Sequence, residues 1–152
     1  MVVPSTQMVI NDILVTCTGN ICRSPTAEII LRHRLAARSI SVTSAGISAL
    51  VGRPICDKAA EILAENGHSS VTHRAKQVTP TMLRQSDLIL TMSHRQRNHI
   101  CSMMPEVRGK VFLLGKWDAG IEIPDPYRRD RRRYEHIYGL IEKTVESWLM
   151  HL

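Results

Sequence analysis

Two cysteines and an arginine stand in a short polar loop that directly follows an apolar run. Residues 13–15 are Ile-Leu-Val, and the loop 17–24 reads Cys-Thr-Gly-Asn-Ile-Cys-Arg-Ser. A thiolate is a strong nucleophile, and an arginine can hold two oxygens of a tetrahedral oxyanion. The Cys-x5-Arg-Ser spacing therefore indicates a phosphate-binding loop with Cys17 at its base and Arg23 on the bound anion.

The surroundings of this loop predict a positive field at the Cys17 thiol. Backbone N–H groups of a tight loop before a helix can converge on an anion, and the helix dipole adds to them. Gly19 and Asn20 suit the left-handed conformations that such a loop needs. We expect this field to favour a Cys17 thiolate, with Ser24 donating a hydrogen bond to the sulfur.

The alternative for Cys17 is a small buried residue without chemistry, as most cysteines at strand ends are. Here the cysteine, the glycine-bearing loop, the arginine and a helix start opened by Pro25 coincide. This coincidence favours a functional loop.

The elements that must position the loop follow from apolar periodicity. We expect strands at 12–16, 40–46, 87–92 and 110–114, and helices at 25–38, 56–67, 94–103 and 132–152. Strands that alternate with helices indicate an α/β domain with a four-stranded, mainly parallel sheet flanked by helices. Ligands of such folds bind beyond the carboxyl ends of the strands, where Cys17 is expected.

Length and composition fit one globular domain. The chain has 152 residues, with 43% hydrophobic and 22% charged, and we assign 1–8 to an N-terminal tail and 9–152 to the domain. No apolar run approaches the ~20 residues of a membrane span, and no signal peptide is evident. We expect a cytoplasmic monomer without membrane insertion. Four cysteines without a CxxC pair argue against structural zinc.

The segment CTGNICRSPTAE, residues 17–28, resembles the signature loop of the low-molecular-weight protein tyrosine phosphatases. Further motifs occur in family order: SAG at 44–46, THRAKQVT at 72–79, DLILTM at 87–92 and IPDPYRR at 123–129. The segments GKVFLLGKWD and EIPDPYR are similar to sequences of the bacterial branch associated with capsule and exopolysaccharide tyrosine kinases.

This resemblance implies a Rossmann-like or flavodoxin-like phosphatase domain that acts on phosphotyrosine in proteins without a metal or other cofactor. It also implies a partner, a tyrosine autokinase of polysaccharide export. Catalysis would fall to Cys17, Arg23 and Asp125. The phosphate would be held by the loop residues Thr18, Gly19, Asn20, Ile21, Cys22, Arg23 and Ser24.

Asp125 is the acid that the resemblance places in the DPY motif. A phenolate leaves far better when a general acid protonates it, and Asp125 would then activate water against the cysteinyl-phosphate. Pro124 and Pro126 restrict the backbone on both sides of it. The alternative for this motif is a solvated turn, in which Asp beside Pro is common.

The resemblance also implies supporting roles around the loop. Tyr127 and Leu50 would form the pocket walls, with Leu50 where many relatives carry an aromatic residue. Asn20, Ser44 and His73 would hold the loop in shape.

Some positions depart from the family pattern or have no evident role. Ser93 stands where many relatives place an acidic residue, which puts loop support there in doubt. Four further histidines are expected on the surface: His33, His94, His99 and His136.

Two features allow further hypotheses. Cys22 could form a reversible disulfide with Cys17, or it could merely pack behind the loop. The run Arg128–Arg133 holds five arginines and one aspartate, a net +4 of the chain's +6. It could steer acidic segments to the site, or it could be an ordinary solvated face.

Three rival functions remain to be weighed. An arsenate reductase needs two further cysteines near each other, whereas Cys56 and Cys101 stand alone in the sequence. Protein-arginine phosphatases tend to carry Thr where this chain has Ile21. A non-catalytic module for phosphate or nucleic acid has no need of Cys17 with Asp125, and aromatic content of 4% disfavours nucleic acid.

Overall fold

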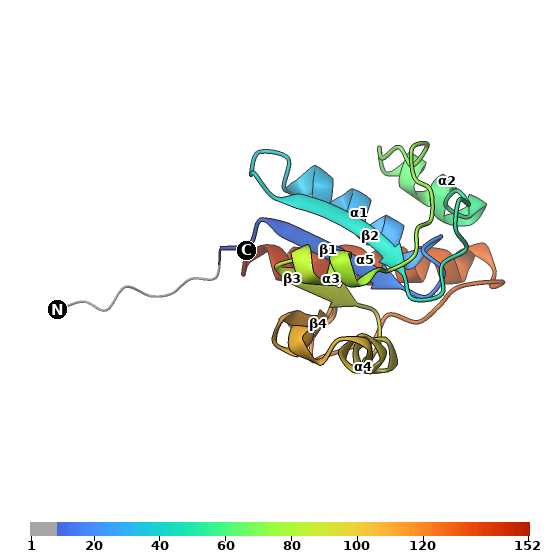
Figure 1. Cartoon of the computed structure of the whole chain (residues 1–152). Coiled ribbons are helices and arrows are strands. Elements are labelled where there is room, and N and C mark those ends of the chain that lie inside the picture. Colours follow the sequence, from blue (N-terminus) through green and yellow to red (C-terminus); the bar gives the residue numbers. More distant parts are fainter. Residues whose placement is uncertain (1–8) are drawn as a thin grey trace.

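Four parallel strands form the central sheet of the structure, a computed structural model that describes residues 9–152 (Figure 1). The strand order is β2-β1-β3-β4, and all three pairings are parallel. The strands are β1 Asp12–Cys17, β2 Ser41–Gly46, β3 Leu88–Thr91 and β4 Val111–Leu113. The expected α/β domain with four strands is confirmed, while the tail assigned to 1–8 lies outside the described residues.

Helices cover both faces of this sheet. They are α1 Arg23–Arg34, α2 Asp57–Glu65, α3 Pro80–Gln85, α4 His94–Met103, the 3₁₀ helix η1 Pro105–Lys110 and α5 Arg131–Leu149. One apolar core joins Ile13 and Val15 to α1, α2 and α5. The other joins Leu14 and Ile89 to α3, α4 and η1. Within 9–152, no helix is both long and apolar enough to cross a membrane.

The helix boundaries differ from the expected ones at α1. The helix begins at Arg23, two residues before Pro25, and ends at Arg34. The proline therefore lies in the first turn, where its missing N–H is not needed. The expectation that the helix runs to 38 was wrong, because the chain turns at Leu35, the last residue of this segment buried in the core.

The register of the parallel strands brings their carboxyl ends together. Cys17 pairs with Gly46, and β3 ends nearby at Thr91. A Cβ atom on residue 46 would lie 2.5 Å from the carbonyl oxygen of Thr18. Only glycine therefore lets β2 end directly against the loop that follows β1.

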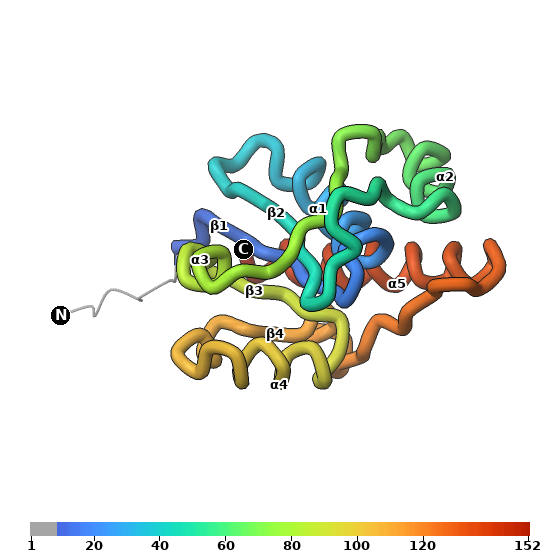
Figure 2. Tube along the Cα trace, turned by 45° about the vertical axis from the view of Figure 1, so that its right-hand side comes forward, coloured from blue at the N-terminus to red at the C-terminus, as the bar shows by residue number. Residues whose placement is uncertain are grey.

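Both ends of the described chain lie at the opposite, amino edge of the sheet (Figures 1 and 2). β1 starts there at Asp12. The Arg38 side chain, just before β2, donates a 2.8 Å hydrogen bond to the carbonyl of Leu152. The amino and carboxyl edges of the sheet thus separate the chain ends from the loop of Cys17.

Candidate active site

The loop 17–24 connects β1 to α1 and encloses the thiol of Cys17. This residue is only 3% exposed, and its Sγ lies 2.8 Å from the hydroxyl oxygen of Ser24. The amide of Thr26 donates to the carbonyl of Cys22 at 3.1 Å, which starts the α1 ladder. The free amides of the first helical turn therefore belong to the same loop as the thiol.

Asn20 is the hydrogen-bonding centre of the loop. Its side-chain amide donates to the hydroxyls of Ser24 at 2.8 Å and Ser44 at 3.0 Å. Its side-chain oxygen accepts the backbone amide of Lys76 at 3.0 Å, and its carbonyl lies 2.7 Å from Nε2 of His73. Asn20 is fully buried, so each of these polar groups needs such a partner. The structure brings Asn20, Ser44 and His73 together.

The left-handed position of the loop is Asn20 alone. Its φ is 59°, whereas Gly19 is not among the residues with positive φ. A Cβ atom on Gly19 would meet the side chains of Ile21 and Leu50 at 3.7–3.8 Å, an ordinary contact distance. The expectation of a left-handed Gly19 was therefore wrong. This glycine instead leaves room where the loop faces the pocket.

Gln96 supports the loop from α4 and was missed in the sequence. Its side-chain amide donates to the hydroxyl of Thr18 at 3.2 Å, and its oxygen accepts the amide of Met92 at 2.9 Å. Ser93 caps α4 by accepting from the amide of Gln96 at 3.2 Å. Gln96 lies in the first turn of the helix that follows β3, at the same edge of the sheet as Cys17. This position was the signal by which the sequence could have indicated it.

The segment after β4 brings a carboxylate to Arg23. The amide of Ile123 donates to the carbonyl of Met92 at 2.9 Å, which anchors the segment at the end of β3. The buried Arg23 donates to the carbonyl of Ile123 at 2.9 Å, and its guanidinium lies 3.7 Å from Oδ2 of Asp125. The side chain of Asp125 is 52% exposed, so solvent reaches it.

A pocket of about 180 Å³ opens above the loop. Leu50 and Tyr127 stand at its rim, 38% and 47% exposed, together with Ser48, which the sequence did not indicate. Backbone bonds hold this rim to the loop: the amide of Leu50 donates to Gly19 O at 3.0 Å and that of Ser48 to Thr18 O at 2.9 Å. Its lining is Cys17, Thr18, Gly19, Asn20, Ile21, Cys22, Arg23, Ser48, Leu50, Asp125 and Tyr127.

A third cysteine lies beside the loop. Cys56, directly before α2, donates its backbone amide to the carbonyl of Ile21 at 2.8 Å, which places it next to Cys22. The neighbouring Cys22 thiol, backbone amides at the start of α2 and the hydroxyl of Tyr134 lower the pKa of Cys56 to about 6, although burial acts to raise it. Interaction with Cys56 and burial raise the pKa of Cys22 well above its ordinary value. Cys56 is isolated in sequence but not in space.

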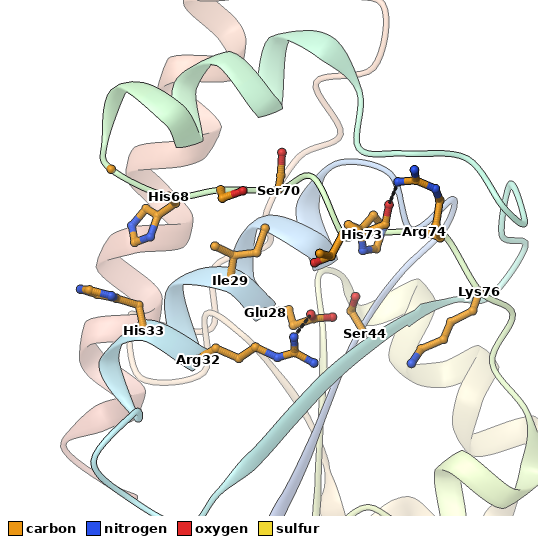
Figure 3. A pocket seen from close by; sticks show the side chains of 13 residues that line it. Glu28, Ile29, Arg32, His33, Ser44, His68, Ser70, His73, Arg74 and Lys76 are labelled. Atoms are coloured by element: carbon orange, nitrogen blue, oxygen red, sulfur yellow. Dashed lines mark hydrogen bonds and ion pairs between the residues drawn. The ribbon is translucent and has the colours of Figure 1, made fainter.

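A separate cavity of about 430 Å³ lies behind the loop (Figure 3). Arg32, Arg74 and Lys76 line it, and a 3.3 Å ion pair with Glu28 engages Arg32. Ser44 and His73, which both hold Asn20, also line it. This cavity does not contain the Cys17 thiol, so the smaller pocket is the candidate active site.

The remaining histidines have no part in this pocket. His33, His94, His99 and His136 are all exposed. Their expected surface positions are confirmed.

A parallel α/β sheet with a thiol, an arginine and the first turn of a helix at one pocket is typical of cysteine-based phosphate-loop proteins. Residues 12–152 match the family model of the low molecular weight phosphotyrosine protein phosphatases, and the chain belongs to this family. The family recognised in the sequence is thereby confirmed, and the protein is a protein-tyrosine phosphatase.

Individual relatives agree over nearly the whole chain. The low molecular weight protein-tyrosine-phosphatase Wzb of Salmonella typhimurium is 44% identical over 142 residues, 93% of this chain and 94% of that protein. The Erwinia amylovora tyrosine phosphatase AmsI has a TM-score of 0.91 at 41% identity, covering 95% of this chain and 94% of that one. Vibrio vulnificus Wzb in complex with benzylphosphonate has a TM-score of 0.90 at 39% identity, covering 95% and 100%.

Proposed function

We propose that this protein hydrolyses phosphotyrosine through a cysteinyl-phosphate on Cys17, with Arg23 on the phosphate and Asp125 as proton donor and acceptor. The observation that carries the proposal is their convergence on one pocket of about 180 Å³. The thiol lies at its base and the carboxylate at its mouth, and the guanidinium ion-pairs with that carboxylate at 3.7 Å.

The first step is attack of the Cys17 sulfur on phosphorus. The loop amides and Arg23 hold the equatorial oxygens and stabilise the charge that they gain in the transition state. Ser24, 2.8 Å from the sulfur, donates its hydroxyl hydrogen to the thiolate. This bond stabilises the sulfur both before attack and when it later leaves phosphorus.

The proton transfers fall to Asp125. As the phosphorus–oxygen bond breaks, the carboxyl protonates the phenolic oxygen, and the resulting carboxylate then takes a proton from the water that attacks the cysteinyl-phosphate. The amide of Tyr127 donates to Oδ1 at 3.1 Å. This bond leaves Oδ2, the oxygen nearer Arg23, for the proton.

The pocket walls favour an aryl ester. Tyr127 offers a ring face on which a substrate phenol can stack, and Leu50 and Ile21 supply apolar surface. The relative from Vibrio vulnificus binds benzylphosphonate, a benzyl group on a phosphonate. The charged guanidinium group of a phosphoarginine would lose more hydration against these apolar walls than the phenyl ring of a phosphotyrosine. The pocket therefore disfavours the arginine phosphatase alternative.

Arsenate reduction is the second candidate, because Cys56 lies beside Cys22. Two thiols near an oxyanion loop are what reduction would require, and the sequence did not reveal this proximity. Arsenite release from arsenate with a thiol reductant measures this activity. If the protein hydrolyses an aryl phosphate but releases no arsenite, arsenate reduction is excluded and phosphatase activity is the remaining function.

The experiment for the main proposal is hydrolysis of p-nitrophenyl phosphate with EDTA present. We expect metal-independent turnover by the wild type, none by Cys17→Ser, and a kcat reduced about 10²- to 10⁴-fold in Asp125→Asn. Full activity of Cys17→Ser would contradict the covalent step. Trapping ³²P on acid-quenched wild type, and its loss in Cys17→Ser, tests the intermediate directly.

We further propose that the physiological substrate is a tyrosine autokinase of polysaccharide export, met by a monomer in the cytoplasm. Support comes from the similarity to Wzb and AmsI. Dephosphorylation of such a kinase by wild type but not by Cys17→Ser, with phosphoserine protein as control substrate, tests it.

A further inference from the structure

We propose that Cys22 and Cys56 form a redox-active pair of their own, in which Cys56 reacts with a hydroperoxide and Cys22 closes a disulfide that ties the phosphate loop to α2. This modification site is distinct from the Cys17–Cys22 pair suggested by the sequence. It does not depend on turnover at Cys17.

Backbone geometry holds the two cysteines within disulfide range. The amide of Cys56 donates to the carbonyl of Ile21 at 2.8 Å, and that carbonyl belongs to the peptide unit that ends at the α-carbon of Cys22. Standard bond lengths then confine the two α-carbons to no more than roughly 6.5 Å. Disulfides span α-carbon separations of roughly 4.4–6.8 Å, so closure needs no large backbone movement.

The two side chains lie in the same part of the core. Cys22 is one of its buried residues and Cys56 packs against it, and the Cys56 sulfur lies 3.8 Å from the hydroxyl oxygen of Tyr134 on α5. Cys22 is 8% exposed and packed in the core, whereas Cys56 is half-buried. Cys56 is therefore the more accessible of the two to solvent and small oxidants.

The charge states divide the two roles. The neighbouring Cys22 thiol, backbone amides at the start of α2 and the Tyr134 hydroxyl lower the pKa of Cys56 and so favour its thiolate. The thiolate is the form that reacts with peroxides. Interaction with Cys56 and burial raise the pKa of Cys22, so Cys22 is suited to resolve the sulfenic acid rather than to initiate the reaction.

The chemistry balances with a hydroperoxide as the oxidant. The Cys56 thiolate attacks the terminal peroxide oxygen, the O–O bond breaks, and an alkoxide or hydroxide leaves and takes up a proton. The Cys22 sulfur then attacks the sulfenic sulfur of Cys56, which forms the S–S bond and expels hydroxide. The thiol proton of Cys22 converts that hydroxide to water. Two electrons pass from the two sulfurs to the peroxide.

Tryptic mapping without reduction distinguishes the possible disulfides. Cys17 and Cys22 share the peptide 1–23, whereas Cys56 lies in 39–58 because Arg53 precedes a proline. A Cys17–Cys22 bond therefore lowers the mass of this one peptide by two hydrogens. A Cys22–Cys56 bond joins two peptides, and fragment ions between the two cysteines of 1–23 identify the linked one.

After mild hydrogen peroxide treatment we expect the joined peptides, linked through Cys22, in wild type and in Cys17→Ser. They should be absent in Cys56→Ser and unchanged in Cys101→Ser, the control, since Cys101 is buried in the other core. Joined peptides that vanish in Cys17→Ser, or none at doses that oxidise Cys17, would overturn the proposal.

A second measurement on native wild type does not depend on the folding of any variant. Brief iodoacetamide labelling near pH 7 should modify Cys56 well before Cys22 and Cys101. Equal labelling of Cys56 and Cys101 would contradict a reactive thiolate at residue 56.

Discussion

Asn20 shows how one residue can set the shape of the loop that follows β1. It combines a left-handed backbone at φ 59° with hydrogen bonds to Ser24, Ser44 and the amide of Lys76. Asparagine visits this conformation more readily than most residues. The same side chain thus turns the loop and ties it to β2.

Substitution of Asn20 separates these two contributions. Asn20→Gly keeps the backbone conformation but strands buried hydroxyls, so we expect a loss of about 1–3 kcal/mol in unfolding free energy. Asn20→Ala should lose roughly 1 kcal/mol more, because its Cβ disfavours positive φ. Urea unfolding measures both. Equal unfolding free energies of the two variants would show that the positive φ at residue 20 is nearly free of strain for a residue with a Cβ atom.

The pKa of Cys56, about 6, gives a pH prediction. Cys22 on the loop, backbone amides at the start of α2 and Tyr134 on α5 lower it, whereas burial of the thiol acts to raise it. Alkylation of Cys56 should rise through pH 6, below the roughly 8.5 of a free thiol. Between pH 6 and about 8.5 the thiol of Cys56 is protonated in the unfolded chain but ionised in the folded one. Cys56 therefore contributes to the free energy of unfolding increasingly as pH rises from 6, and contributes nothing below it.

Tyr134→Phe tests the cause of that shift. Loss of the hydroxyl removes one donor to the thiolate, so the alkylation midpoint should move upward. Tyr138→Phe is the matched control, since Tyr138 lies on the same helix but not against Cys56. An unchanged midpoint in Tyr134→Phe would assign the shift to Cys22 and the helix amides alone.

The sequence indicated those residues whose role rests on local spacing. Cys17 and Arg23 lie on one loop, and Asp125 lies in a recognisable motif. Gln96, Ser48 and the partner of Cys56 depend on contacts between distant segments. Side-chain proximity of that kind follows from tertiary packing, which spacing alone does not encode.

At the scale of elements, the end of β2 controls the loop after β1. Gly46→Ala would place a methyl 2.5 Å from Thr18 O, so the loop or β2 must shift. We expect kcat/KM for p-nitrophenyl phosphate to fall at least about 10²-fold, because misplacement by about 1 Å costs that much. Gly139→Ala on α5, whose added methyl meets nothing within 4 Å, should retain full activity.

The longer elements were predictable because their apolar periodicity is sustained. α3 and η1 were not predicted, and each has six residues with one buried side chain, Leu83 and Val107. One buried residue defines no period. The cap at Thr79, followed by Pro80, was the remaining local signal for α3.

At the scale of the whole molecule, the arginines of the run Arg128–Arg133 do different things. Arg131 pairs with Glu61, Glu65 and Glu135, which fixes α5 to α2. Arg128 lies over the ring of Tyr127, 5.3 Å from its centroid. Arg132 and Arg133 are exposed. The steering hypothesis therefore concerns the arginines other than Arg131.

Replacing Arg128, Arg129 and Arg132 by glutamine tests steering. Less positive charge at the rim should lower kcat/KM for an acidic phosphopeptide at low salt and flatten its salt dependence. Arg131→Gln is the control, since its charge is already balanced, and it should change stability more than the salt slope. A salt slope unchanged in the triple variant would leave the run as a solvated face.

The separation of the chain ends from the pocket has a practical consequence. Both described ends lie at the amino edge of the sheet, close to each other, whereas the pocket lined by Cys17 lies at the carboxyl edge. A second domain, a tag or a solid support attached after Leu152 is therefore held away from the pocket mouth. Because the two described ends are close to each other, a short linker could join them. The protein is then a candidate for circular permutation, with new ends in another loop and the same strand order in the sheet.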